Sequence, residues 1–190
     1  MLTSRFFFMS KKVAIQGVQG SFHHMVCQRY FTSGVGIEPL PTFKQVVEAL
    51  TAKKVDAAVM ALENSIAGSI IPNYAMIDAN ELHITGEYYL DVQHNLMALT
   101  GQSIANIREV YSHPMALLQC QAFFDKHPHI KLVEDSDTAE VAQRIHKQQI
   151  NGIAAIASTA AAEIYQLEIL AQNIQTIQTN ETRFVIIERL

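Results

Sequence analysis

The stretch TFKQVVEALTAKKVDAAVMAL, residues 42–62, decides the fold of this chain. Its first half places four apolar residues at helical spacing: Phe43, Val46, Val47 and Leu50. Its second half, VDAAVMAL, is a continuous apolar run, which is typical of a strand buried on both faces of a parallel sheet. The stretch therefore predicts a helix followed directly by a buried strand.

The neighbouring residues extend this pattern into an α/β domain. Upstream, KKVAIQG (11–17) predicts a strand, and VQGSFHHMVCQRYF (18–31) bends through glycine into a helix. Downstream, three segments repeat the alternation of strand and helix: IREVYSHP (107–114) before MALLQCQAFFDKH (115–127), IKLVEDSD (130–137) before TAEVAQRIHKQ (138–148), and GIAAIAS (152–158) before TAAAEIYQL (159–167). Such alternation predicts an α/β fold with largely parallel strands.

Two segments lack a helical period. ELHITGEYYLDVQHNLMALT, residues 81–100, reads as extended chain, which predicts long strands or a crossing between two lobes. TRFVIIER, residues 182–189, predicts a last strand, and no matching helix precedes it. We therefore expect this strand to return to the first lobe.

Composition excludes several classes of protein. With 49% hydrophobic residues among 190, the chain can bury a substantial core. Fourteen basic and eighteen acidic residues give a net charge of −4, and no basic run could neutralise a phosphate backbone, so nucleic acid is not an expected partner. Cys27 and Cys120 lie far apart, and the eight histidines form no ligand pattern with carboxylates or thiols. Neither a disulfide framework nor a metal site is expected.

The N-terminal MLTSRFFFMS, residues 1–10, is shorter than a signal-peptide core or a membrane span. We expect a short tail there, with the true start at Met1 or Met9, and no membrane partner. A cytoplasmic location also suits two unpaired cysteines.

Polar residues stand at four of the predicted strand-to-helix junctions. They are Gly17 to Ser21, Ser112-His113-Pro114, Ser136-Asp137-Thr138 and Ser158-Thr159. Each could simply cap its helix. However, the carboxyl ends of strands share one edge of an open α/β sheet, and several positive helix ends facing one crevice would attract an anion. The set therefore also predicts an anion site.

The segment ALENSIAGSI, residues 61–70, ends another buried strand with Glu63, Asn64 and Ser65. These side chains could form a turn or a ligand loop. Asn64 is the better ligand candidate, because an amide can donate and accept hydrogen bonds together.

An ordered series of motifs resembles the catalytic domain of prephenate dehydratase. The motifs are GVQGSF (17–22), LENSIAGSI (62–70), SHPMALLQC (112–120), DTAEVA (137–142), GIAAIAS (152–158), AAEIYQLEILAQNIQ (161–175) and NETRF (180–184). The resemblance covers nearly everything from Val13 to Ile187.

The resemblance implies two α/β lobes, similar to the type 2 periplasmic-binding-protein architecture, with the active site in the cleft between them. Lobe one would take residues 11–86 plus 175–190, and lobe two residues 87–174. Many members of the family carry a C-terminal ACT domain that binds phenylalanine. This chain stops at Leu190, so we expect no ACT domain and no feedback by that route. A homodimer is expected from base rates.

The resemblance also carries over individual residues. It implies Thr182 as the catalytic residue, and Arg183 would clamp a substrate carboxylate. Phe184 would pack at the ring-binding wall. The remaining substrate-binding candidates are Asn64, Ser65, Ser112, Gln119 and Thr138.

Two positions depart from the family pattern. Met115 replaces the glutamine of His-Pro-Gln-Ala, and Asp137-Thr138-Ala139 stands where Ser-Thr-Ala is often found. These departures concern the details of the pocket.

The implied activity is the loss of carbon dioxide and water from the dianion prephenate, which gives phenylpyruvate for L-phenylalanine biosynthesis. It needs no cofactor or metal. Two alternatives stay open: an arogenate dehydratase, which acts on the amino analogue, and a cytoplasmic small-molecule-binding protein that uses the same cleft.

Overall fold

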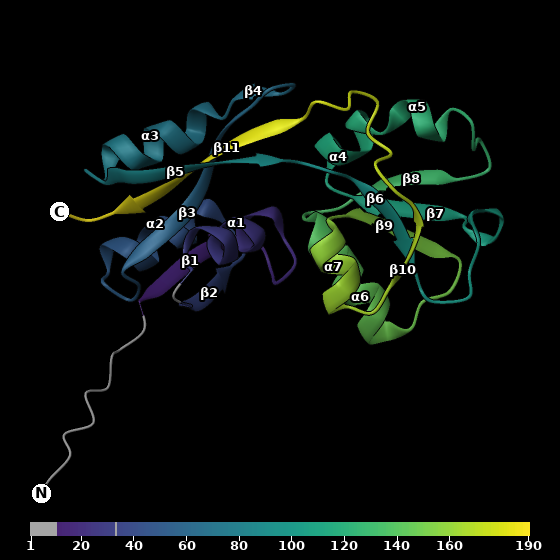
Figure 1. Cartoon of the computed structure of the whole chain (residues 1–190), viewed down its shortest axis with the longest axis horizontal. Helices are drawn as coiled ribbons and strands as arrows, with labels where there is room; N and C mark the ends of the chain where they lie inside the picture. Colours follow the sequence, from purple (N-terminus) through teal and green to yellow (C-terminus); the bar gives the residue numbers. More distant parts are fainter. Residues whose placement is uncertain (1–10, 33) are drawn as a thin grey trace, which may run out of the picture.

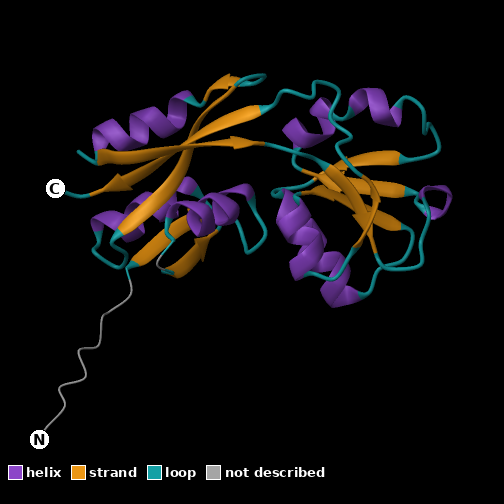
Figure 2. Ribbon diagram, in the orientation of Figure 1, coloured by secondary structure: helices purple, strands orange, loops and turns teal. Residues whose placement is uncertain are grey.

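The computed structural model describes residues 11–32 and 34–190, which form two β-sheets with helices packed on them (Figures 1 and 2). The short tail expected for residues 1–10 lies outside the described residues. Among the described residues, every helix is too short or too polar to cross a membrane.

The first sheet has the strand order β2 (Gly36–Leu40), β1 (Lys12–Gln16), β3 (Ala57–Asn64), β11 (Glu181–Glu188) and β5 (His83–Asp91), with the short β4 (Gly68–Ser69) beside β3. Strand β1 runs parallel to β2 and β3, whereas β11 is antiparallel to both β3 and β5. The expectation that the last strand returns to the first lobe is confirmed.

Helices cover both faces of this sheet. Along β3, Ala58, Met60 and Leu62 pack with α2 (Phe43–Thr51) and α3 (Ile71–Ala79). The alternate residues Ala57, Val59 and Ala61 pack with α1 (Phe22–Tyr30). Because side chains alternate along a strand, a strand covered on both faces must be apolar throughout. The helix and buried strand predicted within residues 42–62 are confirmed.

The second sheet has the order β10 (Glu168–Ala171), β6 (Asn95–Ala98), β9 (Ile153–Ala157), β7 (Glu109–Ser112) and β8 (Lys131–Glu134). Its helices are α4 (Pro114–Gln119), α5 (Gln121–Phe124), α6 (Thr138–Gln148) and α7 (Thr159–Ile164), and a 3-10 turn, η1, spans Ile104–Asn106. The single helix expected over residues 115–127 is instead two short helices, because the backbone at Cys120 leaves the helical region, with φ −103° and ψ 10°.

The chain crosses between the sheets twice, at residues 92–94 after β5 and again after β10 on the way to β11 (Figure 1). Sheet pairing runs to Asp91 at the end of β5, so a lobe boundary at residue 86 would cut this strand. We propose that the division falls at residue 92 instead.

The two lobes also touch through the loop that follows β1. Ser158 Oγ donates a hydrogen bond to the carbonyl of Gly20 at 2.6 Å, and the Tyr165 hydroxyl donates to the carbonyl of Gln19 at 2.7 Å. A side chain at Gly20, where φ is +85°, would come within 2.8 Å of the Ala161 Cα. The first lobe therefore rests directly on α7 of the second.

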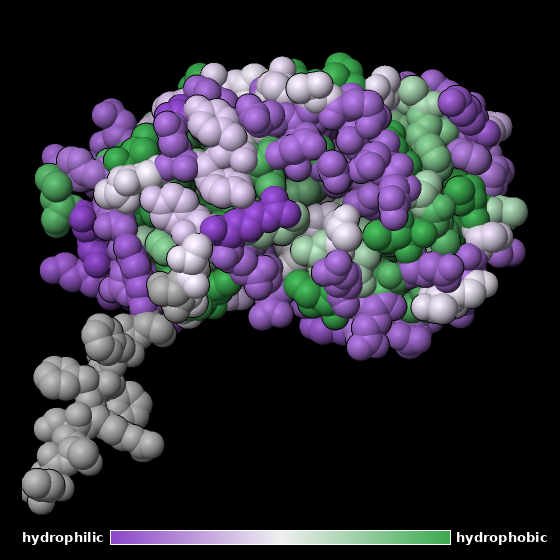
Figure 3. All heavy atoms as spheres, viewed as in Figure 1, coloured by the Kyte–Doolittle hydropathy of each residue, from purple (hydrophilic) through white to green (hydrophobic). Residues whose placement is uncertain are grey.

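The outer surface is mixed. On the face in Figure 3, hydrophilic residues lie over both lobes, with smaller groups of hydrophobic residues between them. Both cysteines are free and buried, and burial raises the pKa of Cys27 to about 11 and that of Cys120 to about 12. Neither thiol is therefore ionised near neutral pH.

Candidate active site

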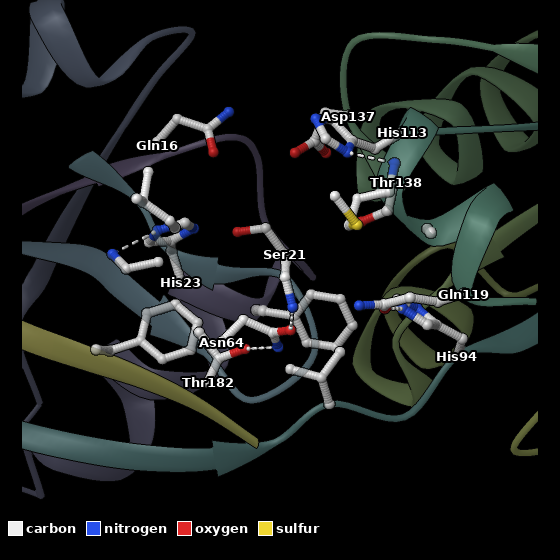
Figure 4. A pocket seen from close by; sticks show the side chains of 18 of the residues that line it. Gln16, Ser21, His23, Asn64, His94, His113, Gln119, Asp137, Thr138 and Thr182 are labelled. Atoms are coloured by element: carbon white, nitrogen blue, oxygen red, sulfur yellow. Dashed lines mark hydrogen bonds between the residues drawn. The ribbon is translucent and has the colours of Figure 1, made fainter. Parts of the chain in front are cut away.

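A cavity of about 390 Å³ lies between the lobes and takes side chains from both (Figure 4). Gln16, Ser21, His23, Asn64 and Thr182 come from the first lobe, and His94, His113, Gln119, Asp137 and Thr138 from the crossing and the second lobe. Such a cavity, mostly apolar with a few convergent polar groups, is typical of a small-molecule site.

Asn64 fixes the Thr182 hydroxyl. The Asn64 Oδ1 accepts from the backbone N–H groups of Ile66 at 3.0 Å and Ala67 at 2.9 Å, which determines which way the amide faces. Its Nδ2 then donates to Thr182 Oγ1 at 2.8 Å. Since the threonine oxygen already accepts a hydrogen bond, its own hydrogen can be donated to another group. Thr182 lines the cavity, so that group can be a ligand.

The same amide starts a chain of hydrogen bonds between the lobes. Asn64 Nδ2 also donates to Asn180 Oδ1 at 2.7 Å, and Asn180 Nδ2 donates to Gln119 Oε1 at 3.0 Å. His94 Nε2 lies 2.8 Å from the same Gln119 oxygen. Because an amide oxygen only accepts, His94 must carry its proton on Nε2. The Gln119 amide nitrogen makes no hydrogen bond to another described residue.

His94 is 3% exposed and lines the cavity. Its Nδ1 is buried and has no partner among the described residues. Burial lowers the pKa of His94, and its hydrogen bond to Gln119 opposes that shift. The imidazole is therefore neutral, with one unused acceptor nitrogen.

His23 belongs to the aromatic wall of the cavity. Its Nε2 accepts from the backbone N–H of Ala61 at 3.3 Å, and its ring packs edge-on against Phe43 and Phe184. Burial lowers the pKa of His23 to about 4. The ring is thus neutral, and it contributes an apolar surface.

Asp137 is the acidic residue of the cavity. Its Oδ1 accepts from the backbone N–H groups of Ala139 at 2.8 Å and Glu140 at 3.0 Å, which caps α6. Burial raises the pKa of Asp137. Its Oδ2 faces the first lobe, because a side chain added at Gly17 would come within 3.0 Å of this oxygen.

Of the eight predicted site residues, five line the cavity: Asn64, Gln119, Thr138, Thr182 and Phe184. The structure does not place Ser65 and Ser112 there. Ser112 is fully buried, and its hydroxyl donates to the Ile156 carbonyl at 2.8 Å. Ser65 is exposed, and its oxygen accepts from the Glu181 N–H at 2.9 Å, which ties the Asn64 loop to β11.

Arg183 also lies outside the cavity. Alternation along β11 directs Thr182 and Phe184 into the cavity and Arg183 to the opposite face. There its Nε lies 2.8 Å from Glu87 Oε2, and its Nη1 lies 3.6 Å from Glu63 Oε1. Glu87 raises the pKa of the guanidinium. This placement argues against the predicted carboxylate clamp.

Several residues of the site are absent from the predicted set, among them His23, His94 and Asn180. Asn180 opens the NETRF motif and could have been included with it. His94 is one polar residue in an extended segment, and the sequence carries no signal for it. No cluster of three metal-ligating side chains occurs within residues 11–32 and 34–190.

The two lobes and their shared cavity define a protein of the type 2 periplasmic-binding-protein architecture. A lipoprotein from Bacillus subtilis has the same fold, with a TM-score of 0.50 at 12% identity, over 95% of this chain and 83% of that one. The expected fold class is confirmed.

The chain belongs to the prephenate dehydratase family, whose model matches residues 13–190. Arogenate dehydratase 2 of Petunia hybrida is 39% identical over 178 residues, which are 94% of this chain and 45% of that protein. The bifunctional chorismate mutase/prephenate dehydratase of Enterobacter agglomerans is 31% identical over 182 residues, which cover 94% of this chain and 47% of that protein. The chain thus spans about half the length of these curated relatives.

A solved structure gives the same result. The prephenate dehydratase of Arthrobacter aurescens in complex with L-Phe has a TM-score of 0.86 at 26% identity, over 94% of this chain and 60% of that one. The resemblance inferred from the motif series is confirmed.

Proposed function

We propose that the protein is a lyase that converts prephenate to phenylpyruvate, carbon dioxide and water in L-phenylalanine biosynthesis. The observation that carries this proposal is the Thr182 hydroxyl, which Asn64 orients so that its hydrogen can be donated into the cavity. The family of the chain supports the reaction class.

The reaction breaks two bonds of the ring. The electron pair of the bond to the ring carboxylate moves into the ring as carbon dioxide leaves, and the C–O bond on the opposite side of the ring breaks. The leaving hydroxide needs one proton to become water. Thr182 donates a hydrogen bond to that oxygen, and charge develops on it only as the bond breaks, so this contact favours the transition state over the substrate.

The apolar part of the cavity promotes decarboxylation. His23 is neutral, and together with Phe43 and Phe184 it gives the ring an environment of low polarity. A carboxylate is poorly solvated there, whereas neutral carbon dioxide is not penalised. No lysine or arginine side chain lines the cavity within the described part of the chain. The carboxylate that must be lost is therefore not held by a cation.

Arogenate is a second candidate substrate. It undergoes the same bond changes and gives L-phenylalanine, and it carries an ammonium group where prephenate has a ketone. Asp137 is an acidic side chain in the cavity and could accept this group. A relative named as an arogenate dehydratase adds support. A protein that only binds its ligand would not need the Thr182 hydroxyl to be oriented as a donor, which argues against this alternative.

The test is turnover of each substrate by the purified protein, with phenylpyruvate followed by its absorbance in alkali and L-phenylalanine by chromatography. Thr182→Ala should lower kcat by 10² to 10³, on the order of 2.7 to 4 kcal/mol of barrier, whereas Thr182→Ser should retain most activity. Asn64→Asp should lower kcat as much as Thr182→Ala does, because a carboxylate would accept the hydrogen bond that Thr182 otherwise donates to the substrate. Thr100→Ala is the matched control, because Thr100 is exposed and lies outside the cavity. Folded wild type without product from either substrate would refute the proposal.

We also propose a cytoplasmic homodimer. Two buried, free thiols support a reducing compartment, and two-fold dimers are the commonest oligomers. Cell fractionation and light scattering test the two parts separately.

A further inference from the structure

The Asp137 carboxylate has one oxygen that the fold does not use. Its Oδ1 accepts both hydrogen bonds that cap α6. No donor among residues 11–32 and 34–190 reaches Oδ2. That oxygen faces the first lobe beside Gly17, and Asp137 lines the cavity (Figure 4).

Capping does not require a carboxylate at this position. Ser21 caps α1 and Ser158 caps α7 with a hydroxyl alone. Serine, asparagine and aspartate are about equally good in that role. A charged side chain therefore adds something that the helix does not need, and burial makes its charge costly.

The surroundings of Asp137 contain no fixed positive charge. The other titratable side chains that line the cavity are His23, His94 and His113, of which His23 and His94 are held neutral by burial. Glu140, on the same helix, raises the pKa of Asp137 through its like charge, and the nearby His113 lowers it. No lysine or arginine lines the cavity among the described residues, so a cationic group of a ligand would meet no fixed positive charge beside Oδ2.

We propose that Asp137 binds the ammonium group of arogenate and so sets the preference for the amino substrate over prephenate. This inference rests on the proposed dehydratase function. Prephenate and arogenate share both carboxylates and the ring hydroxyl, and they differ only in the ketone or ammonium of the side chain. An ammonium can donate a charge-assisted hydrogen bond to Oδ2. A ketone can only accept, so it meets the carboxylate oxygen without any hydrogen bond.

The experiment compares kcat/KM for both substrates in wild type, Asp137→Asn and Asp137→Ser. Both variants keep a side chain that can cap α6, so the fold should persist, as circular dichroism and the melting temperature would check. Each should lower the ratio of arogenate to prephenate efficiency about tenfold or more. Glu134→Gln is the matched control, because it removes one exposed carboxylate three residues away and should leave the ratio unchanged.

A second measurement uses the products and needs no turnover. L-phenylalanine carries the ammonium group and phenylpyruvate does not. Calorimetric titration of each compound into the wild type and into Asp137→Asn, without substrate, gives the affinity for each side chain. The substitution should weaken the binding of L-phenylalanine about tenfold, and it should leave the binding of phenylpyruvate unchanged or make it tighter.

The outcomes separate the two levels of the inference. A folded wild type that consumes neither substrate refutes the dehydratase function itself. A wild type that is active on prephenate alone, or an Asp137→Asn variant that loses both activities equally, overturns only the role of Asp137. A fall in the substrate ratio, with a parallel loss of L-phenylalanine affinity, supports it.

Discussion

The direction of one hydrogen bond determines what Thr182 can do. Two backbone N–H groups fix the Asn64 amide, and the amide in turn occupies a lone pair of the threonine oxygen. The hydroxyl is thus available as a donor. A threonine is a poor acid, so orientation of its hydrogen-bond dipole, and not acidity, is what this geometry supplies.

Arg183 allows a direct test of the carboxylate clamp inferred from the motif. Its ion pairs with Glu87 and Glu63 are partly exposed, and such pairs contribute roughly 0.2 to 1 kcal/mol. We predict that Arg183→Gln lowers the free energy of unfolding within that range and changes the Michaelis constant by less than about threefold. Urea titration and steady-state kinetics would measure both. A Michaelis constant raised by two orders of magnitude would restore the clamp.

The site was only partly predictable from sequence at this scale. The motif series identified Thr182, Asn64 and Gln119, which meet in the cavity. Alternation along a strand already places Arg183 on the face opposite Thr182, and the prediction ignored this rule. Ser112 was carried over from its motif, but its hydroxyl donates to the Ile156 carbonyl. No pattern in one sequence could have shown that.

Among the elements, the junctions between strands and helices are the best predicted. Ser21, His113, Asp137 and Ser158 each cap a helix through the side chain. The first three also line the cavity, so capping and a place in the site are not exclusive. The division of residues 115–127 into α4 and α5 was missed. The apolar spacing continues across Cys120, whereas the helical conformation of the backbone is interrupted there.

The loop between β1 and α1 holds the lobes together at Gly20. We predict that Gly20→Ala destabilises the protein more than Gly34→Ala. Both positions have positive φ, +85° and +73°, so they share a cost of about 1 kcal/mol. Only at Gly20 would the new Cβ meet backbone, 2.8 Å from Ala161 Cα, which adds roughly 1 to 3 kcal/mol.

Thermal melting of the two glycine variants measures the difference. Gly20→Ala should also lower kcat/KM, because Gly20 adjoins the cavity residue Ser21. Equal melting temperatures would mean that the lobes separate here without cost.

For the molecule as a whole, buried neutral histidines make stability depend on pH. The pKa of His23 falls from 6.5 to about 4 on folding, so the unfolded chain binds the proton more readily. The stabilisation is therefore complete above pH 6.5 and declines as the pH falls towards 4. His24 and His94 have pKa values lowered in the same direction.

We predict that the protein loses free energy of unfolding between pH 7 and pH 5, with about 2 kcal/mol due to His23. His23→Gln should reduce this loss by that amount, as urea titrations at the two pH values would show. His83 is exposed, so His83→Gln is the control and should leave the loss of unfolding free energy between pH 7 and pH 5 unchanged. If wild type and His23→Gln lose the same free energy of unfolding between the two pH values, then His23 is not held neutral by burial.

The position of β11 between β3 and β5 also determines the order in which the two lobes can fold during synthesis. All strands of the second sheet lie within residues 95–171, so this sheet can close while residues 181–188 are still being synthesised. Until β11 emerges, β3 and β5 keep open edges that other chains could pair with. The first lobe is thus expected to fold after the second. Thr182 enters with β11, so a chain made only as far as residue 180 lacks the hydroxyl that we propose as the catalytic donor.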